Sequence, residues 1–296
     1  MRAREKARRA LQQRLARRPR YRGPSLNRLI PNILTMLGLC AGLVGIRFAF
    51  EGQFGPAAAM IVAAAVIDGL DGRIARLLKG TSAFGAEFDS LSDFLCFGVA
   101  PALVLYLWSM QEVGHLFFLP CVIYAVCVAL RLARFNAALF DDPGAPPQPP
   151  KPLFALNFFT GVPAPAAAGL VLFPLFAALT AQGWGLEGLG HALRHPILVA
   201  IFLVGAGILA ISTLPAWSGK RIKVPSQMVL PLMLAVLALA TLLLTEPWAA
   251  ITLVILLYAL MLALSVRAYR RLERDWLAAE DATSEAPAPS HQSPGA

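Results

Sequence analysis

Long apolar runs separated by short polar segments fill the chain between about residue 30 and residue 268. Each run is close to the ~20 residues that an α-helix needs to cross the hydrocarbon core of a bilayer. The pattern predicts an all-α fold, a polytopic membrane helical bundle of about eight transmembrane helices. The predicted spans are 30–49, 56–78, 92–110, 114–136, 162–181, 196–216, 226–245 and 248–268.

Composition supports a membrane protein rather than a soluble one. Of the 296 residues, 57% are hydrophobic and 15% are charged, whereas about 25% are charged in an ordinary soluble domain. The net charge of +9 does not indicate a nucleic-acid partner, because the basic residues cluster at the ends of apolar runs, where lipid headgroups explain them. The four cysteines lie in apolar runs without metal-ligand spacing, which is typical of small buried residues.

The basic residues also predict the orientation of the chain. Residues 1–28 hold 11 Lys and Arg, and an even number of spans puts both termini on one side. Of the 26 basic residues, only Arg47 and Arg194 then fall on the opposite side. By the positive-inside rule, both termini are cytoplasmic. The protein is expected in the inner (cytoplasmic) membrane.

Polar segments divide the chain into an arm, a membrane domain and a tail. Residues 1–28 form a basic cytoplasmic N-terminal arm, either a short helix lying on anionic lipid or an unstructured determinant of topology. The membrane domain is expected over 29–270. Residues 271–296, rich in Ala, Ser, Pro and Glu, are predicted to be a disordered cytoplasmic tail. A loop at 141–151 with five prolines should be extended.

Four aspartates stand in or beside the second and third apolar runs: Asp68, Asp71, Asp89 and Asp93. An acidic side chain near the centre of a membrane helix costs about 2.5–3.5 kcal/mol on insertion scales, so it usually faces a polar cavity or a cation. Helical spacing places the first two on one face and the last two on another. Helices meeting along these faces would gather four carboxylates, a hard-oxygen site that suits Mg²⁺ or Mn²⁺.

The depth of these residues favours a site near the cytoplasmic surface. Asp68 lies roughly 18 Å along the helix from an outer start near Pro56, at about 1.5 Å per residue. A water-soluble reactant and a lipid headgroup can meet at that level. A set of buried ion pairs would need equal numbers of basic residues there, and only Arg73 and Arg76 are available. Both arginines suit phosphate oxygens.

The acidic residues belong to a longer pattern with fixed spacing, D-x2-D-G-x2-A-R-x8-G-x3-D-x3-D. It is formed by Asp68, Asp71, Gly72, Ala75, Arg76, Gly85, Asp89 and Asp93. On these residues the chain resembles the CDP-alcohol phosphatidyltransferase family over about residues 28–235. The segments 81–85, 97–102, 131–136 and 161–167 resemble its phosphatidylserine synthase branch. That branch implies the reaction of CDP-diacylglycerol with L-serine to give phosphatidylserine and CMP.

The resemblance also implies roles for individual residues. Two divalent ions would be held by Asp68, Asp71, Asp89 and Asp93, and Asp93 would be the general base that takes the serine hydroxyl proton. The CDP-lipid would be bound by Asn32, Thr35, Asp68, Gly72, Ala75, Arg76 and Gly85. On physical grounds, Arg131 or Arg134 is a candidate for the serine carboxylate and equally a plain positive-inside anchor. Lys220 could contact the lipid phosphate, although anchoring is the favoured interpretation. A homodimer is expected from the family alone.

Two other functions stay open from sequence. The acceptor alcohol could be glycerol phosphate, inositol phosphate or choline, although a phosphate-bearing acceptor should need further basic residues. The chain could instead be a divalent-cation transporter. That function predicts acidic residues along a path through the membrane, whereas the outer half offers little beyond Glu51 and Glu112.

Overall fold

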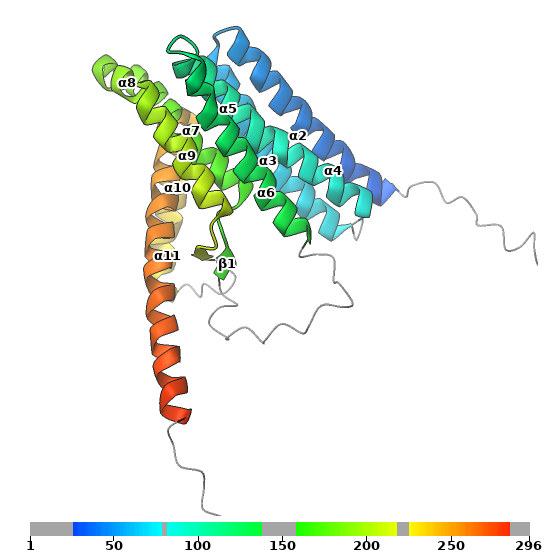
Figure 1. Ribbon diagram of the computed structural model, residues 1–296, viewed down its shortest axis with the longest axis vertical. Coiled ribbons are helices and arrows are strands. Elements are labelled where there is room, and N and C mark those ends of the chain that lie inside the picture. Colours follow the sequence, from blue (N-terminus) through cyan, green and yellow to red (C-terminus); the bar gives the residue numbers. More distant parts are fainter. Residues whose placement is uncertain (1–25, 79–81, 138–157, 218–224, 285–296) are drawn as a thin grey trace, which may run out of the picture.

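The protein is a bundle of long helices that lie side by side, as seen in a computed structural model that describes residues 26–78, 82–137, 158–217 and 225–284 (Figure 1). The continuous long helices are α2 (Leu26–Phe50), α3 (Phe54–Leu77), α6 (Leu119–Ala137), α7 (Ala164–Gly183), α9 (Pro196–Ile211), α10 (Val229–Thr245) and α11 (Pro247–Ser284). One further span is assembled from four consecutive segments: α4 (Ala83–Asp93), η1 (Phe94–Val99), α5 (Ala100–Leu105) and η2 (Tyr106–Met110). The short helices are η3 (His115–Phe118), α8 (Glu187–Leu193) and η5 (Ser226–Met228).

In the described residues, seven helices are long and apolar enough to cross a membrane. An eighth span arises if α8 and α9, which meet at a bend of 55°, count as one. This confirms the predicted class, a helical bundle of about eight spans, and indicates an integral membrane protein. α10 has no buried residue and packs mainly along α11, so most of its apolar surface is available to lipid.

Several predicted boundaries were wrong. The third span was expected at 92–110 but starts at Ala83, where the Ser82 hydroxyl accepts a hydrogen bond of 3.0 Å from the Gly85 N–H and caps the helix. Polar residues in this first part lower its hydropathy, so the pattern of apolar runs did not predict it. The disordered tail was expected from 271, whereas α11 stays helical to Ser284 and extends past the bundle (Figure 1).

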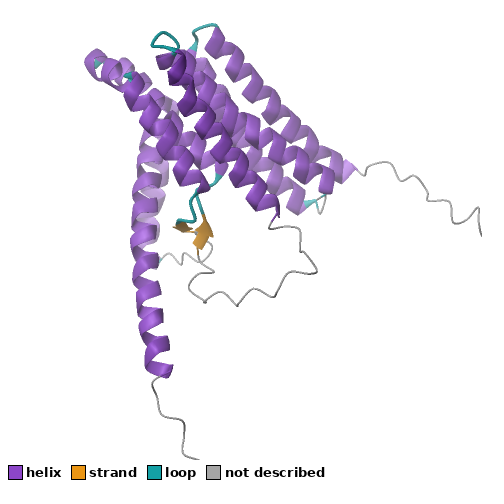
Figure 2. Cartoon of the chain, viewed as in Figure 1, coloured by secondary structure: helices purple, strands orange, loops and turns teal. Residues whose placement is uncertain are grey.

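The structure also contains a pair of strands that the all-α prediction did not include (Figure 2). The predicted span 196–216 ends early, at Ile211, and β2 (Pro215–Trp217) follows it. β2 pairs antiparallel with β1 (Phe158–Thr160), which leads into α7. The buried Ser265 hydroxyl of α11 donates a 2.7 Å hydrogen bond to the Pro215 carbonyl. The strands thus tie the ends of three helices together on one side of the bundle.

Small residues let α2 approach its neighbours closely. A Cβ atom at Gly42 would lie 2.6 Å from the Cys96 sulfur, and one at Gly45 would lie 3.1 Å from the Ala57 carbonyl oxygen. Helices in membranes associate largely by such close backbone packing, because lipid tails are as apolar as the side chains. The packing places α2 against both α3 and the span from Ala83 to Met110, which are the two helices that carry the acidic residues.

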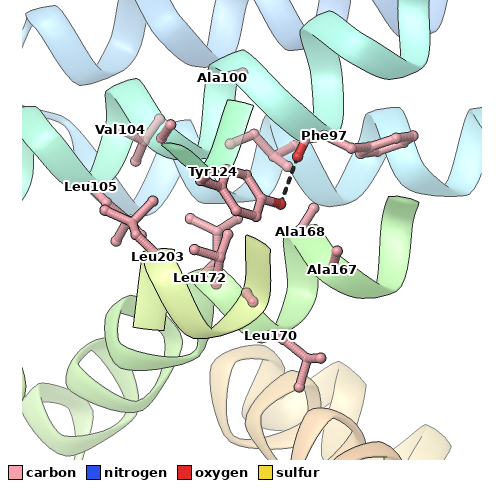
Figure 3. Close-up of a cluster of buried hydrophobic side chains, with 14 of the residues drawn as sticks. Phe97, Ala100, Val104, Leu105, Tyr124, Ala167, Ala168, Leu170, Leu172 and Leu203 are labelled. Carbon is pink, nitrogen blue, oxygen red and sulfur yellow. Dashed lines mark hydrogen bonds between the residues drawn. The ribbon is translucent and has the colours of Figure 1, made fainter. Parts of the chain in front are cut away.

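A buried hydrogen bond fixes α6 against the third span (Figure 3). The Tyr124 hydroxyl donates to the Phe97 carbonyl oxygen at 2.8 Å, and Tyr124 is fully buried. In an α-helix this carbonyl would accept from residue 101, but Pro101 has no N–H. The tyrosine hydroxyl therefore supplies the donor that Pro101 lacks, to a carbonyl in the π-helical segment η1.

Candidate active site

Three carboxylates from two helices meet at one point of the bundle. Asp68 and Asp71 come from α3 and Asp89 from α4, and one carboxylate oxygen of each lies within 4.8 Å of the others. Asp71 is only 4% exposed. Thr35 of α2 donates its hydroxyl to Asp71 Oδ2 at 2.9 Å, so α2 orients one carboxylate of the cluster.

Asp93 lies beside these three residues. Its side chain lies beside that of Asp68. Both line a void of about 10 Å³, between α2, α3 and the third span, that Asp71 and Asp89 also line. The structure therefore brings together all four aspartates that the motif singled out, with Asp93 on the inner side, toward Cys96 and Phe97.

The charge of this cluster fits a divalent cation. In the described residues, Arg47–Glu51 is the one ion pair within 4.0 Å, so no arginine or lysine there neutralises the carboxylates by direct contact. Uncompensated charges in a low-dielectric region are strongly disfavoured. Carboxylate oxygens this close together are ligands that a hard divalent metal ion prefers. The coarse prediction of a divalent-metal site agrees with this arrangement.

A cavity of about 210 Å³ lies next to the cluster. Its lining residues come from the start of α2, the end of α3 and the start of α4: Pro31, Asn32, Thr35, Asp71, Gly72, Ala75, Arg76, Ser82, Gly85, Ala86 and Asp89. Six of the seven residues predicted to bind the CDP-lipid line it, while Asp68 faces the small void instead. Of the two arginines expected near phosphate, Arg76 lines the cavity and Arg73 does not.

Gly85 and Gly72 contribute to this cavity in different ways. A Cβ atom at Gly85 would lie 3.0 Å from Asn32 Oδ1 and 3.0 Å from Ser82 Oγ, closer than ordinary van der Waals contact. At Gly72 the nearest atom would be an Arg76 guanidinium nitrogen at 4.0 Å, so a methyl group there would project into open space. Gly85 therefore permits the approach of α2 to α4, and Gly72 leaves room for a ligand.

On the family resemblance, we expect Gly85→Ala to raise the KM for the CDP-lipid about 10-fold, because Asn32, which lines the cavity, must shift by a few tenths of an ångström. The scale follows from overpacking costs of about 1–3 kcal/mol. The measurement is CMP release against CDP-lipid concentration. Gly69→Ala is the control, since nothing lies within 4 Å of its added Cβ. Equal KM values for both variants and the wild type would show that Asn32 need not stay where the structure has it.

The acceptor candidates differ in their surroundings. Arg134 donates from Nη1 to the Ile211 carbonyl oxygen at 3.0 Å, where it stabilises the last turn of α9. Arg131, on the same helix, is half-buried and lies within electrostatic range of Asp93. Lys220 lies outside the described residues.

Sequence reasoning missed Tyr258 of α11. Its hydroxyl is buried without a hydrogen-bond partner among the described residues, as is the Nε atom of Arg131, and the two side chains are within electrostatic range of each other. No sequence signal pointed to it, because it stands in an ordinary apolar run far from the motif.

The fold and the site define an integral membrane protein with an acidic cluster, suited to a divalent cation, beside a small cavity. A family model, CDP-alcohol phosphatidyltransferase, matches residues 28–193, and the chain belongs to this family. It is 38% identical to the CDP-diacylglycerol–serine O-phosphatidyltransferase of Mycobacterium tuberculosis (strain ATCC 25618 / H37Rv) over 263 residues, which cover 88% of this chain and 84% of the relative.

Two further relatives are more distant. The protein of the same name from Helicobacter pylori (strain ATCC 700392 / 26695) is 36% identical over 196 residues, covering 66% of this chain and 74% of that protein. An archaetidylserine synthase from Methanothermobacter thermautotrophicus (strain ATCC 29096 / DSM 1053 / JCM 10044 / NBRC 100330 / Delta H) is 31% identical over 141 residues, 47% of this chain and 54% of the relative. The similarity to the first relative extends well beyond the part that the family model matches.

Proposed function

We propose that this protein transfers the phosphatidyl group of CDP-diacylglycerol to the hydroxyl of L-serine and releases CMP. The observation that carries the proposal is the gathering of the eight motif residues around one metal-binding cluster and one cavity. The choice of serine is supported by the relatives, since two are named serine O-phosphatidyltransferases and the third an archaetidylserine synthase.

In this proposal the cavity receives the nucleotide end of the CDP-lipid. Arg76 faces phosphate oxygens there, since a guanidinium matches them in geometry and charge. Asp68, Asp71 and Asp89, with Asp93 beside them, hold two divalent ions, Mg²⁺ or Mn²⁺. When bound, these ions neutralise the diphosphate and stabilise the charge on the leaving CMP.

Asp93 serves as the general base for the acceptor. The serine hydroxyl oxygen forms a bond with the phosphorus that carries the diacylglycerol, the bond from that phosphorus to the CMP oxygen breaks, and Asp93 takes the hydroxyl proton. Arg131 lies near Asp93 and supplies a positive charge for the carboxylate of the same serine. Arg134 is occupied with the end of α9.

The direct test incubates the purified full-length protein with CDP-diacylglycerol, Mg²⁺ or Mn²⁺, and one of several acceptors, and follows CMP release. L-serine should support turnover, and glycerol phosphate, inositol phosphate and choline should not. Excess chelator should stop the reaction. CMP release with another acceptor only would overturn the choice of serine, and no release with any of them would contradict the transferase proposal.

We also propose that the acidic cluster faces the cytoplasm. Residues 53 and 79 flank the single span α3, and the predicted topology assigns 24 of the 26 basic residues to the side of residue 79. In a background without the four native cysteines, Lys79→Cys should react with an impermeant thiol reagent only from the cytoplasmic side, and Gln53→Cys only from the outside. Labelling of both residues from the same side would contradict the proposed orientation of α3.

The homodimer that the family implies is part of the same proposal. Its test is the mass of the detergent-solubilised protein, corrected for bound detergent. A single-chain mass at concentrations that support full turnover would exclude a dimer as the active form.

A further inference from the structure

Two buried polar atoms in the described part of the chain lack a hydrogen-bond partner: Nε of Arg131 on α6 and the hydroxyl of Tyr258 on α11. A buried donor left unpaired is costly, so it is rare unless a ligand or water completes it. The Arg131 side chain is within electrostatic range of Tyr258. Two unpaired donors from different helices therefore lie within electrostatic range of each other inside the bundle.

The packing of α6 fixes where these donors lie. The Tyr124 hydroxyl holds one turn of α6 on Phe97 at 2.8 Å, and the Asn136 amide nitrogen donates to Ser90 Oγ at 3.0 Å. On α6, Arg131 lies between Tyr124 and Asn136. On the antiparallel third span, Asp93 lies between the partners of these two residues, Phe97 and Ser90. The register of the two helices thus sets the guanidinium beside Asp93, in agreement with the electrostatic contact between them.

Tyr258 approaches the same place from α11. It also lines an apolar cavity of about 460 Å³ between α3, α7, α10 and α11. Its hydroxyl is buried and has no hydrogen-bond partner among the described residues. Neither Tyr258 nor Arg131 lines the cavity that holds Arg76, so the two donors are separate from the nucleotide cavity.

We propose that Arg131 and Tyr258 form an oxyanion subsite that holds the carboxylate of the amino-acid acceptor and makes Tyr258 a specificity-determining residue. The inference rests on the proposed serine transferase activity and extends it. A guanidinium and a phenol both donate, and a carboxylate offers two acceptor oxygens. A carboxylate bound here leaves the hydroxyl of the same small molecule next to Asp93.

The test is Tyr258→Phe, which removes the hydroxyl oxygen alone. With the full-length protein, CDP-diacylglycerol and Mg²⁺, the KM for L-serine should rise about 10-fold or more, the usual scale for a hydrogen bond to a charged group. kcat and the KM for CDP-diacylglycerol should change by less than about 2-fold, because the hydroxyl is proposed to contact the acceptor carboxylate and neither the reacting atoms nor the CDP-lipid. Any turnover with ethanolamine, which has no carboxylate, should be unaffected.

Tyr106→Phe is the matched control. Tyr106 contacts the Phe118 ring at 5.1 Å and lies about 20 Å along the span from Asp93, at 1.5 Å per residue. It should leave every constant unchanged. The metal-free Tyr258→Phe protein should unfold at the wild-type temperature or higher, since an unpaired buried hydroxyl has been removed.

Two kinetic outcomes would overturn the inference. An unchanged KM for L-serine would show that the hydroxyl does not meet the acceptor. A rise in the KM for CDP-diacylglycerol instead would assign the donors to a lipid phosphate.

A binding experiment separates failure of this inference from failure of the serine transferase proposal. Thermal stabilisation by L-serine in the presence of CDP and Mg²⁺ reports binding without turnover. Such stabilisation in the wild type and its loss in Tyr258→Phe would support the subsite, and its absence from the wild type would refute it.

Discussion

Asp71→Asn should lower CMP release about 1,000-fold or more, because it removes a charged ligand at the centre of the acidic cluster. The carboxylate is almost fully buried and is oriented by the Thr35 hydroxyl. The amide keeps the size of the side chain, so the loss reflects charge. Turnover is measured with saturating CDP-diacylglycerol and L-serine over a range of Mg²⁺ concentrations.

The same variant should show an opposite effect on stability. Without metal, removing one of several mutually repelling carboxylates should leave the unfolding temperature equal or higher. Added Mg²⁺ should stabilise the wild type strongly and the variant weakly, since a ligand that binds the folded state stabilises it. Glu87→Gln is the control for charge removal, because Glu87 is exposed on the helix that carries Asp89. A metal response in Asp71→Asn equal to that of the wild type would contradict the assignment of Asp71 as a metal ligand.

Asp93→Asn should lower kcat about 10²–10⁴-fold, the range for removal of a general base, while the CDP-lipid still binds in the presence of metal. Asp93 lies beside Asp68, on the side of the cluster toward Cys96 and Phe97, and within electrostatic range of Arg131. The amide cannot take the proton of the serine hydroxyl. The measurements are metal-dependent affinity for CDP-diacylglycerol and turnover with L-serine.

Asp68→Asn provides the comparison for this prediction. It takes charge from the ion cluster itself, so it should weaken metal-dependent binding of the CDP-lipid as well as turnover. If Asp93→Asn loses binding as completely as Asp68→Asn, Asp93 is chiefly a ligand. The base would then have to be another group near the serine hydroxyl.

The acidic cluster could be predicted from sequence because its geometry is largely local. Helical periodicity puts Asp68 near Asp71 and Asp89 near Asp93 on their own helices, and adjacent antiparallel spans bring the two pairs to the same level. The cost of charge in an apolar segment is also a property of sequence. Boundaries were predicted less well, since the start of α4 at Ala83 depends on a Ser82 cap and not on hydropathy.

The chain by itself determined the membrane class, the number of spans and the eight motif residues, since hydropathy and fixed helical spacing follow from the order of residues. Only the tertiary structure decided which basic and polar side chains lie near the acidic cluster. Arg131 and Arg134 look alike in sequence, yet one contacts the end of α9 and the other lies near Asp93. Tyr258 lies within electrostatic range of Arg131, although its helix stands more than a hundred residues further along the chain. Such contacts are set by the packing of helices that are distant in sequence, and no local pattern encodes which face of one helix meets which face of another.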